Sequence, residues 1–518
     1  MQKVNPPADG RPPESVLVIG AGPAGLFASA ELARHGIAAR LIERDPVLHR
    51  EARATSVQPG TLEILESVGL LAPFLDAAEH VRGSRVYGPD MAELRAMRFD
   101  GVDCRCQFQC SLPQYEIQRI LEAHLLSLGG AVERGVTATA VAAGTDGVRV
   151  ELVHATGRRE TVQADIVVDA GGAHSVTRQS MDDPLEGSTY EGHFLVADVA
   201  MPALLPRDEA SVVCSSEGML LLAPLPGGRW ISFQDLEAEV QRVSAADVID
   251  RIEARLDGRC RPTDVAWSAP FRMHRRIVSR LADGQRFLIG DAAHLSSPFG
   301  GEGLNSALHD GYDLAWKLAL VMHGHARRSL LDDYAIERAA ADRHVLEISD
   351  RMHRAIMGLA EAVRERRDIP VAIADPVAAA LLRNARAMID VDYAGSPLVA
   401  DCVPSGSGAE PHPGQRYPDW TRLGGMSHRV LVFGPVADTE SLARLTSRWA
   451  RHVDIARDPD LDPARAGVPA GGCVLIRPDG HIGFRCVATD AAAIAALDRH
   501  LSSYLIPYGG NGRAGSTS

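Results

Sequence analysis

Alternating apolar runs and helical patterns mark the first part of the chain. Val16–Ile19 is a continuous aliphatic run of strand length, and Ala24–His35 has the spacing of a buried helix that Gly36 ends. Ile37–Ile42 follows as a second aliphatic run. Strand, helix and strand in this order predict a βαβ unit and therefore a parallel sheet. Arg286–Ile289 restores the pattern of a buried parallel strand much later in the chain.

The segment from about residue 185 to residue 272 has a different pattern. Its short apolar stretches, Phe194–Val199, Met219–Leu225 and Trp230–Phe233, are spaced like successive strands of one sheet. A single stretch, Ala245–Leu256, has helical periodicity. We therefore expect an antiparallel sheet with one helix, inserted between the two parts of the parallel-sheet unit.

Two long helices and a separate small unit are predicted for the rest of the chain. Gly303–Met322 and Leu331–Arg367 have the pattern of long helices. Residues 404–414 are rich in Pro, Gly and Ser and indicate a linker. Beyond it, the pattern predicts a βαβ-plus-hairpin unit with elements at Val430–Phe433, Ser441–Ala450, Val474–Ile476 and Ile482–Arg485.

Composition excludes several classes of protein. A hydrophobic fraction of 46% with 23% charged residues excludes disorder over most of the 518 residues. The net charge of −13 argues against a nucleic-acid-binding surface. No apolar run reaches the roughly 18 residues that a membrane span needs. The polar start of the chain lacks the apolar core of a signal peptide. We therefore expect a cytoplasmic protein that binds neither nucleic acid nor membrane.

Cysteine usage points to neither a disulfide scaffold nor a metal centre. The chain has eight cysteines, which are spread over 518 residues. Cys104, Cys106 and Cys110 lie close together, but no histidine or CxxC pair completes a ligand set. We therefore expect no bound metal and interpret these residues as ordinary thiols in a reducing compartment.

A glycine-rich turn follows the first predicted strand. Gly20-Ala21-Gly22-Pro23-Ala24-Gly25 stands between a strand and a helix, where glycines let the backbone approach a pyrophosphate at the helix N-terminus. Glu43 ends the next strand, and a carboxylate there accepts hydrogen bonds from the ribose hydroxyls of an adenosine. Together these residues predict a dinucleotide-binding site.

A second glycine-rich stretch follows the strand at Arg286–Ile289. It begins with Gly290-Asp291, whose carboxylate can hold a ribityl or ribose hydroxyl, and we expect the helix after it to direct its N-terminus at a phosphate. It continues as Pro298-Phe299-Gly300-Gly301-Glu302-Gly303-Leu304-Asn305. Glycines here make room for a planar ring against the backbone, and free N–H groups can stabilise negative charge on that ring.

These motifs resemble those of the class A flavoprotein monooxygenases, the aromatic hydroxylases of the para-hydroxybenzoate hydroxylase fold. Further stretches carry the same resemblance: Arg53–Glu63, Leu112-Pro113-Gln114, and the helix with Asp310, Asp313, Leu314, Ala315, Trp316 and Lys317. Residues 475–480, Leu-Ile-Arg-Pro-Asp-Gly, resemble the thioredoxin-like extension of the phenol and polyketide hydroxylases. This C-terminal unit contains no CxxC pair, so we expect it to be structural and not a redox module.

The resemblance implies an α/β fold built from three domains. A doubly wound FAD-binding domain would comprise residues 1–184 and 276–403, the second part including a helical segment. A β-sheet substrate-binding domain at 185–275 would be inserted in it. A thioredoxin-like domain would comprise residues 404–518.

The resemblance also implies the cofactor site and the reaction. The cofactor-binding residues would be Gly20, Gly22, Pro23, Ala24, Gly25, Glu43, Arg44, Arg53, Gln114, Gly290, Asp291, Pro298, Gly300, Gly301, Gly303, Leu304 and Asn305. NADPH or NADH would reduce FAD, and O2 would then give a flavin C4a-hydroperoxide that hydroxylates a phenolic or polycyclic, polyketide-like aromatic substrate. Pro298, Gly301 and Asn305 would position the flavin, with no side-chain base assigned. A homodimer is one option for the assembly.

One departure from the family pattern bears on flavin reduction. The family has an Asp-Gly pair with a nearby Arg as a third fingerprint, and Gly171 stands where the Asp is expected, whereas Gly172 and Arg178 fit. We expect Arg178 to lack one carboxylate partner as a result. The corresponding hypothesis is that NAD(P)H reduces the flavin slowly without substrate and that Gly171→Asp speeds this step. Asp169, two residues earlier, is the residue that could compensate.

Two other functions remain open at this point. One is a flavoenzyme of the same fold that performs Baeyer–Villiger insertion, epoxidation or modification of an antibiotic. The other is a non-catalytic, FAD-dependent ligand binder, which the Gly171 departure suggests. Product analysis separates the first from aromatic hydroxylation, and NADPH oxidation that stays at background with candidate substrates would favour the second.

Overall fold

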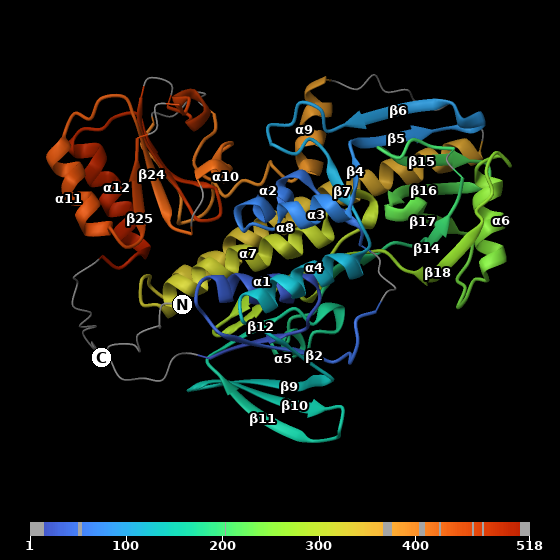
Figure 1. Cartoon of the computed structure of the whole chain (residues 1–518), viewed down its shortest axis with the longest axis horizontal. Helices are drawn as coiled ribbons and strands as arrows, with labels where there is room; N and C mark the ends of the chain where they lie inside the picture. Colours follow the sequence, from blue (N-terminus) through green and yellow to red (C-terminus); the bar gives the residue numbers. More distant parts are fainter. Residues whose placement is uncertain are drawn as a thin grey trace.

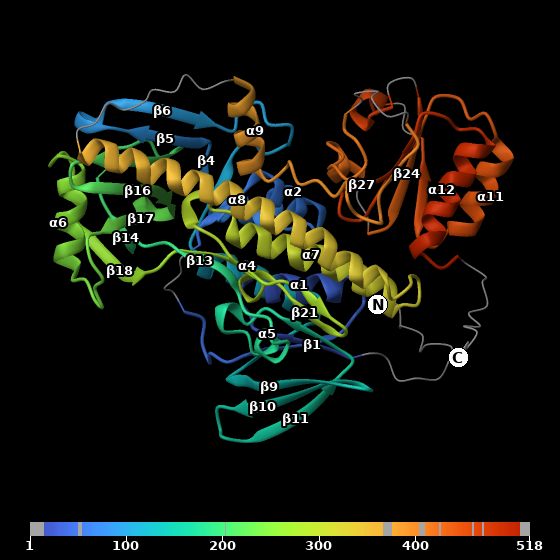
Figure 2. The same cartoon turned by 180° about the vertical axis from the view of Figure 1, so that it is seen from behind.

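The computed structural model describes residues 15–49, 54–202, 204–365, 376–403, 410–423, 426–457, 460–468 and 471–507. Figures 1 and 2 show two lobes along the long axis: a large one that contains about the N-terminal three-quarters of the chain, and a smaller one built from the C-terminal elements. Most of the predicted 404–414 linker and the Gly/Ser-rich C-terminal residues lie outside the described ranges.

A six-stranded sheet forms the centre of the large lobe, in the order β20-β21-β12-β1-β2-β8. Its strands are β20 (Ala282–Asp283), β21 (Arg286–Leu288), β12 (Ile166–Asp169), β1 (Val16–Ile19), β2 (Ala39–Glu43) and β8 (Val132–Arg134). All neighbouring pairs are parallel except β20 with β21. The sequence predicted β1, β2 and β21 as strands of one parallel sheet, and the structure pairs β1 with β2 and places β12 between β1 and the late strand β21.

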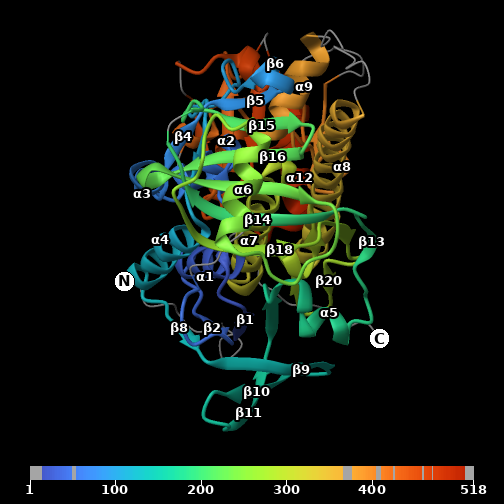
Figure 3. The same ribbon diagram turned by 90° about the vertical axis from the view of Figure 1, so that its right-hand side faces the viewer.

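The two faces of this sheet are covered differently. Val16 and Val18 pack with the helices α1 (Pro23–Arg34) and α7 (Gly303–Met322), and α4 (Gln114–Ser127) packs against α1. Leu17 and Ile19 point to the opposite face, as alternation along a strand requires, and pack on a three-stranded ribbon. That ribbon is β11-β10-β9, with β9 at Val136–Gly144, β10 at Gly147–His154 and β11 at Arg159–Ala164. Figure 3 shows it projecting at one end of the molecule.

The second large sheet has seven strands in the order β18-β14-β17-β16-β15-β5-β6. They are β18 (Asp264–Phe271), β14 (His193–Ala200), β17 (Arg229–Leu236), β16 (Gly218–Leu225), β15 (Ala210–Ser215), β5 (Gly83–Tyr87) and β6 (Glu93–Arg98). Helix α6 (Ala245–Arg255) and the long helix α8 (Leu330–Arg364) both pack against this sheet. The predicted substrate domain at 185–275 therefore omits two strands, β5 and β6, which come from the N-terminal part of the chain.

Short elements connect the two sheets. Two further three-stranded sheets are β3-β7-β4, with β3 at Ser56–Val57, β7 at Gln109–Ser111 and β4 at Glu79–Val81, and β13-β19-β22, with β13 at Glu186–Thr189, β19 at His274–Ile277 and β22 at His294–Leu295. The remaining helices of the large lobe are α2 (Pro59–Ser67), α3 (Leu71–Ala77), α5 (Val176–Ser180) and α9 (Pro376–Ala387). Within the described ranges, none of the helices combines the length and the apolar character that crossing a bilayer requires.

The small lobe is a five-stranded sheet with helices, in the order β23-β27-β26-β24-β25. Its elements are β23 (Ala400–Asp401), α10 (Trp420–Leu423), β24 (His428–Phe433), α11 (Thr439–Trp449), β25 (Val453–Ala456), β26 (Gly472–Ile476), β27 (Ile482–Cys486) and α12 (Ala491–Tyr504). The predicted strand, helix and hairpin correspond to β24, α11 and β26–β27. Cys473 and Cys486 face each other across this hairpin as free thiols.

Candidate active site

One cavity of about 660 Å³ joins the carboxyl end of the six-stranded sheet to the seven-stranded sheet. At one end it is lined by the turn after β1 and by the ends of β2 and β12. At the other end, four side chains of the seven-stranded sheet line it: Ala210, Leu221, Ala223 and Phe233. The loop between β22 and α7, residues 296–304, lines the stretch between these ends. A single elongated site is therefore shared by the two sheets.

Two different physical reasons explain why the first turn contains glycines. Gly20 has φ +95°, and a Cβ there would lie 2.6 Å from the Ala170 carbonyl oxygen. A Cβ at Gly25 would lie 1.9 Å from the Gly20 carbonyl oxygen, so this glycine is required by close packing of the turn. A Cβ at Gly22, by contrast, meets no atom within 4 Å. Because Gly22 lines the cavity, its missing side chain leaves room for a ligand and not for another part of the protein.

The N-terminus of α1 faces this space and is not capped by a side chain. Gly22 is the N-cap residue, and Pro23 occupies the first helical position. Free backbone N–H groups and the positive end of the helix dipole suit a phosphate. The Glu43 carboxylate beside the turn accepts hydrogen bonds from the amides of Ala21, at 2.7 Å, and Asp45, at 2.9 Å. These bonds fix the carboxylate at the cavity wall, and each of its oxygens keeps a further lone pair for a hydroxyl donor.

The loop from Pro298 to Gly303 is held from behind by Asn305. The Asn305 side chain accepts a hydrogen bond from the Gln58 amide at 2.8 Å and donates to the carbonyls of Ser56 and Gly301, at 2.9 and 2.6 Å. Gly301 itself has φ +67°. Asn305 is fully buried and does not line the cavity. It therefore positions the loop and does not face a ligand directly.

The turn at Gly290-Asp291 is separated from the next α-helix by an extended loop. The residues form a single 3-10 turn, Gly290–Ala292, and the next α-helix, α7, begins only at Gly303. The helix expected after this motif is therefore α7, with the bounds predicted from the sequence. The Gly290 amide donates to the Asp310 carboxylate at 2.9 Å, which ties the turn to α7. Asp291 lines the cavity.

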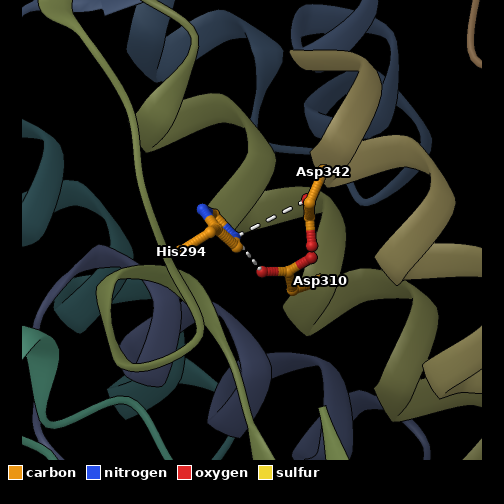
Figure 4. A group of neighbouring side chains, drawn as sticks. All are labelled: His294, Asp310 and Asp342. Carbon is orange, nitrogen blue, oxygen red and sulfur yellow. Dashed lines mark hydrogen bonds and ion pairs between the residues drawn. The ribbon is translucent and has the colours of Figure 1, made fainter. Parts of the chain in front are cut away.

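Behind this turn lies a buried network of charged side chains (Figure 4). His294 Nε2 lies 2.9 Å from Asp310 Oδ2 and 3.6 Å from Asp342 Oδ1. The Arg338 guanidinium pairs with both carboxylates, at 2.8 and 3.0 Å. Burial opposes the charged imidazolium, but Asp342 and Asp310 outweigh it and raise the pKa of His294 to about 9. His294 and the two aspartates have the spacing of metal ligands. With His294 protonated, however, two cations already balance two carboxylates, and we interpret the group as an ion-pair network.

The neighbourhood of Gly171 is held together by Asp169 and Arg178. The Asp169 carboxylate accepts hydrogen bonds from the Gly171 amide at 2.6 Å, the Ser175 hydroxyl at 2.7 Å and the Thr177 amide at 3.1 Å. The Arg178 guanidinium donates to the carbonyls of Ala292, at 3.0 Å, and Ala173, at 2.5 Å. Among the described residues Arg178 forms no ion pair with a carboxylate, as expected, but these backbone carbonyls accept its guanidinium hydrogen bonds. Asp169 organises the loop in which Gly171 lines the cavity.

The predicted site residues divide into three groups. Those that line the cavity are Gly20, Gly22, Pro23, Ala24, Glu43, Arg44, Gln114, Asp291, Pro298, Gly300, Gly301, Gly303 and Leu304. Gly25, Gly290 and Asn305 lie behind its wall, where they shape or tie the turns. Arg53 lies outside the described residues. Sequence reasoning missed the wall residues that come from the seven-stranded sheet, and it missed Gln109, Glu302 and Arg386, which also line the cavity.

Comparison with known proteins identifies the family of enzymes to which this chain belongs. Residues 14–349 match the family model described as "FAD binding domain", and residues 410–505 match the one described as "Aromatic-ring hydroxylase, C-terminal". The chain belongs to the FAD-dependent aromatic-ring hydroxylases. The matched FAD-binding domain of the hydroxylase, residues 14–349, includes the first turn, the Gly290 turn and α7.

Relatives match nearly the whole hydroxylase. It is 32% identical over 540 residues to the 6-methylpretetramide 4-monooxygenase of Streptomyces rimosus, covering 92% of this chain and 91% of the relative. The solved structure of an anhydrotetracycline hydroxylase from Streptomyces rimosus matches with a TM-score of 0.76 at 25% identity, over 95% of this chain and 99% of the other. A ternary complex of aklavinone-11 hydroxylase with FAD and aklavinone shares the fold, with a TM-score of 0.78 at 24% identity over 94% and 98% of the two chains.

These matches confirm the predicted α/β fold, the family and the class of enzyme. The hydroxylase is an FAD-dependent monooxygenase with the C-terminal domain of its family. The alternative functions, including a non-catalytic ligand binder, are not favoured by these relatives. The cavity also fits the cofactor on its own evidence, because Gly22 leaves an open cradle beside an uncapped helix N-terminus and a fixed carboxylate.

Proposed function

We propose that this hydroxylase inserts one oxygen atom from O2 into a phenolic or polycyclic, polyketide-like aromatic substrate, with FAD as cofactor and NADPH or NADH as reductant. The observation that carries the proposal is the single cavity that extends from the dinucleotide turn to the apolar side chains of the seven-stranded sheet. A cofactor held at one end can therefore reach a substrate held at the other. The relatives named for pretetramide and anhydrotetracycline substrates support the polycyclic class.

The cofactor end would be held mainly by backbone groups. The turn at Gly20–Gly25 and the N-terminus of α1 would receive the pyrophosphate, and Glu43 would bind ribose hydroxyls. Asp291 and the loop of Gly300, Gly301 and Gly303 would hold the ribityl chain and the ring. Bound FAD supplies the hydride acceptor and the site of O2 activation that no amino-acid side chain provides.

The contribution of the polypeptide is then positioning and exclusion of water. Asn305 and Gln58 fix the loop that would lie beside the ring. Leu221 and Phe233 make the opposite wall apolar, which suits a flat aromatic ring and keeps water out of the reaction volume. On this basis residues 1–184 and 276–403 are assigned to cofactor binding. The sheet of residues 185–275, extended by β5 and β6, is assigned to substrate binding, and residues 404–518 to structural support.

A direct test combines cofactor analysis with product analysis. Purified protein should carry FAD that acid precipitation releases. A panel of phenolic and polycyclic compounds, such as emodin, alizarin and anthrone, is then screened for stimulated oxidation of NADPH and NADH. The proposal expects at least one compound to stimulate oxidation and to gain one oxygen atom on a ring carbon. A ketone converted to an ester would indicate oxygen insertion of the Baeyer–Villiger type and would contradict aromatic hydroxylation.

A further inference from the structure

A buried carboxyl group in the cavity wall finds no hydrogen-bond partner for either oxygen among the residues that the structure describes. Glu302 stands between Gly301 and Gly303, immediately before α7, and its side chain is 1% exposed. Within the described ranges, both carboxyl oxygens are buried without a hydrogen-bond partner. The carboxyl group lies over Gly300, where an added Cβ would come within 2.4 Å of its atoms. Gly300 therefore makes room for this carboxyl group, which the fold brings into the cavity wall and leaves unsatisfied.

A buried guanidinium from a distant helix lines the same cavity. Arg386 is near the end of α9, is 7% exposed, and donates to the Ser84 hydroxyl of β5 at 3.0 Å. Its Nε is buried and has no hydrogen-bond partner in the described part of the chain. Ser84 pairs with Ala210 of β15, which also lines the cavity, so Arg386 lies at the substrate-sheet end. In the part of the chain that the structure describes, Glu302 and Arg386 form no ion pair with each other.

The other charged groups that act on Glu302 neutralise one another. His344 of α8 and Asp390, just after α9, form an ion pair at 2.9 Å. Burial raises the pKa of the Glu302 carboxyl to about 8, opposed by Arg386 and His344 and reinforced by Asp390. Burial lowers the pKa of the Arg386 guanidinium, which Glu302 raises. A buried carboxyl and a buried guanidinium, each with an unused polar atom, therefore border one cavity without satisfying each other.

We propose that Glu302 and Arg386 form a polar subsite that binds a phenolic hydroxyl of the aromatic substrate, with the guanidinium donating a hydrogen bond to the hydroxyl oxygen and the carboxylate accepting the hydrogen bond that the hydroxyl donates. A hydroxyl group fits this pair because it is both acceptor and donor. Binding there would fix one edge of the ring and so select which carbon faces the loop at Pro298–Gly301. The inference rests on the proposed function, because it takes the ligand to be an aromatic substrate.

The chemistry predicts discrimination against substrates that lack the hydroxyl. A methyl ether of the same ring system cannot donate to Glu302, so the buried carboxylate stays unsatisfied in its complex. Since the carboxylate is the acceptor, the preference for the hydroxyl should increase as pH rises through the pKa of Glu302. A glutamine at this position still accepts a hydrogen bond but does not titrate.

The test uses the FAD-loaded protein, without reductant, and two probes: beta-naphthol and its methyl ether. Dissociation constants are measured from the change in flavin absorption between about pH 7 and about pH 9, on either side of the pKa of Glu302. Wild type should prefer beta-naphthol by about tenfold at the higher pH and less at the lower. Glu302→Leu and Arg386→Met should lose the preference, and Glu302→Gln should keep part of it without pH dependence. Arg386→Lys should retain part of the preference.

Arg383→Met is the matched control, because Arg383 lies on the same helix, binds the Asp100 carbonyl and does not line the cavity. It should keep the wild-type preference. FAD occupancy and thermal melting of each variant report whether it is folded. Equal affinities of wild type for the two probes, an unchanged preference in Glu302→Leu, or no saturable binding of beta-naphthol would overturn the subsite. Because binding is read without turnover, these outcomes are separate from failure of hydroxylation in the product assay.

Discussion

Arg477 of the C-terminal domain donates hydrogen bonds from its two terminal guanidinium nitrogens to the two carboxylate oxygens of Glu337 on α8, with Nη2 to Oε2 at 2.8 Å. Both residues are almost fully buried. Lys317 of α7 pairs with Glu337 and with Asp313, and Asp479 pairs with Arg477. The C-terminal domain is therefore fastened to α7, the helix that begins at the loop of the cavity.

Removing one partner of this pair should destabilise the whole protein. Arg477→Met leaves the Glu337 and Asp479 carboxylates buried with fewer cations, which typically costs about 3–5 kcal/mol. Denaturant unfolding of wild type and variant measures the loss. Arg444→Met is the control, because Arg444 forms an exposed pair with Glu440, and it should change stability by less than about 0.5 kcal/mol. A loss no larger than the control's would contradict a docking role for Arg477.

The two kinds of glycine in the first turn predict opposite phenotypes. Gly22→Ala should fold with a stability loss of at most about 1 kcal/mol, since its Cβ meets no protein atom and only the N-cap residue changes. It should nevertheless bind FAD at least about tenfold more weakly, because the methyl group enters the ligand's space. Gly25→Ala should instead fail to fold or melt far below wild type. FAD titration and thermal melting of the apoproteins distinguish these results. Unchanged FAD affinity in Gly22→Ala would show that the cradle is not used.

Gly171→Asp should impair the enzyme, contrary to the hypothesis that the sequence alone suggests. A Cβ at Gly171 would lie 2.8 Å from Asp169 Oδ1, and the new carboxylate would stand beside an existing one. We expect FAD affinity to fall by at least about tenfold and flavin reduction by NAD(P)H to be no faster. Gly171→Ala separates crowding from charge, because it adds the Cβ alone. Stopped-flow reduction that is faster in Gly171→Asp would restore the original hypothesis.

The buried His294 network predicts a stability that falls in alkaline solution. The pKa of His294 is raised to about 9 in the folded protein, above the value of about 6.5 for an unperturbed histidine. The charged His294 therefore contributes about 3 kcal/mol to the free energy of unfolding. This contribution is complete below about pH 6.5 and is lost as pH rises through about 9. The melting temperature of wild type should fall over this range, and His294→Gln should show a smaller fall. Parallel curves for the two proteins would contradict a charged His294.

Much of the fold could be predicted from local sequence patterns. Glycines and prolines mark the ends of α1, α2 and α7, and the bounds of α7 agree with the predicted helix at Gly303–Met322. The buried strand β1 is a run of four aliphatic residues, and β12 is three aliphatic residues followed by Asp169, a pattern that suits a strand covered on both faces. The glycine turn and Glu43 were predicted as one site because their spacing is fixed by a single βαβ unit.

Contacts between distant segments could not be predicted in this way. Nothing in the residues of β5 shows that it joins β15, more than a hundred residues later. Glu302 lies inside a recognised loop, but its relation to Arg386 depends on how α9 packs against β5. The Arg477–Glu337 pair likewise joins two domains. Such pairs are set by tertiary packing, which hydrophobic periodicity does not encode.

The most direct test of the central claim is the origin of the oxygen atom in the product. The FAD-loaded enzyme is supplied with NADPH, an accepted phenolic substrate and isotopically labelled dioxygen. The molecular mass of the product is then measured by mass spectrometry. Aromatic hydroxylation by an FAD-dependent monooxygenase predicts one labelled oxygen atom per product molecule, attached to a ring carbon. A product that carries its new oxygen from water, or NADPH oxidation that yields no oxygenated product with any substrate, would contradict the assignment.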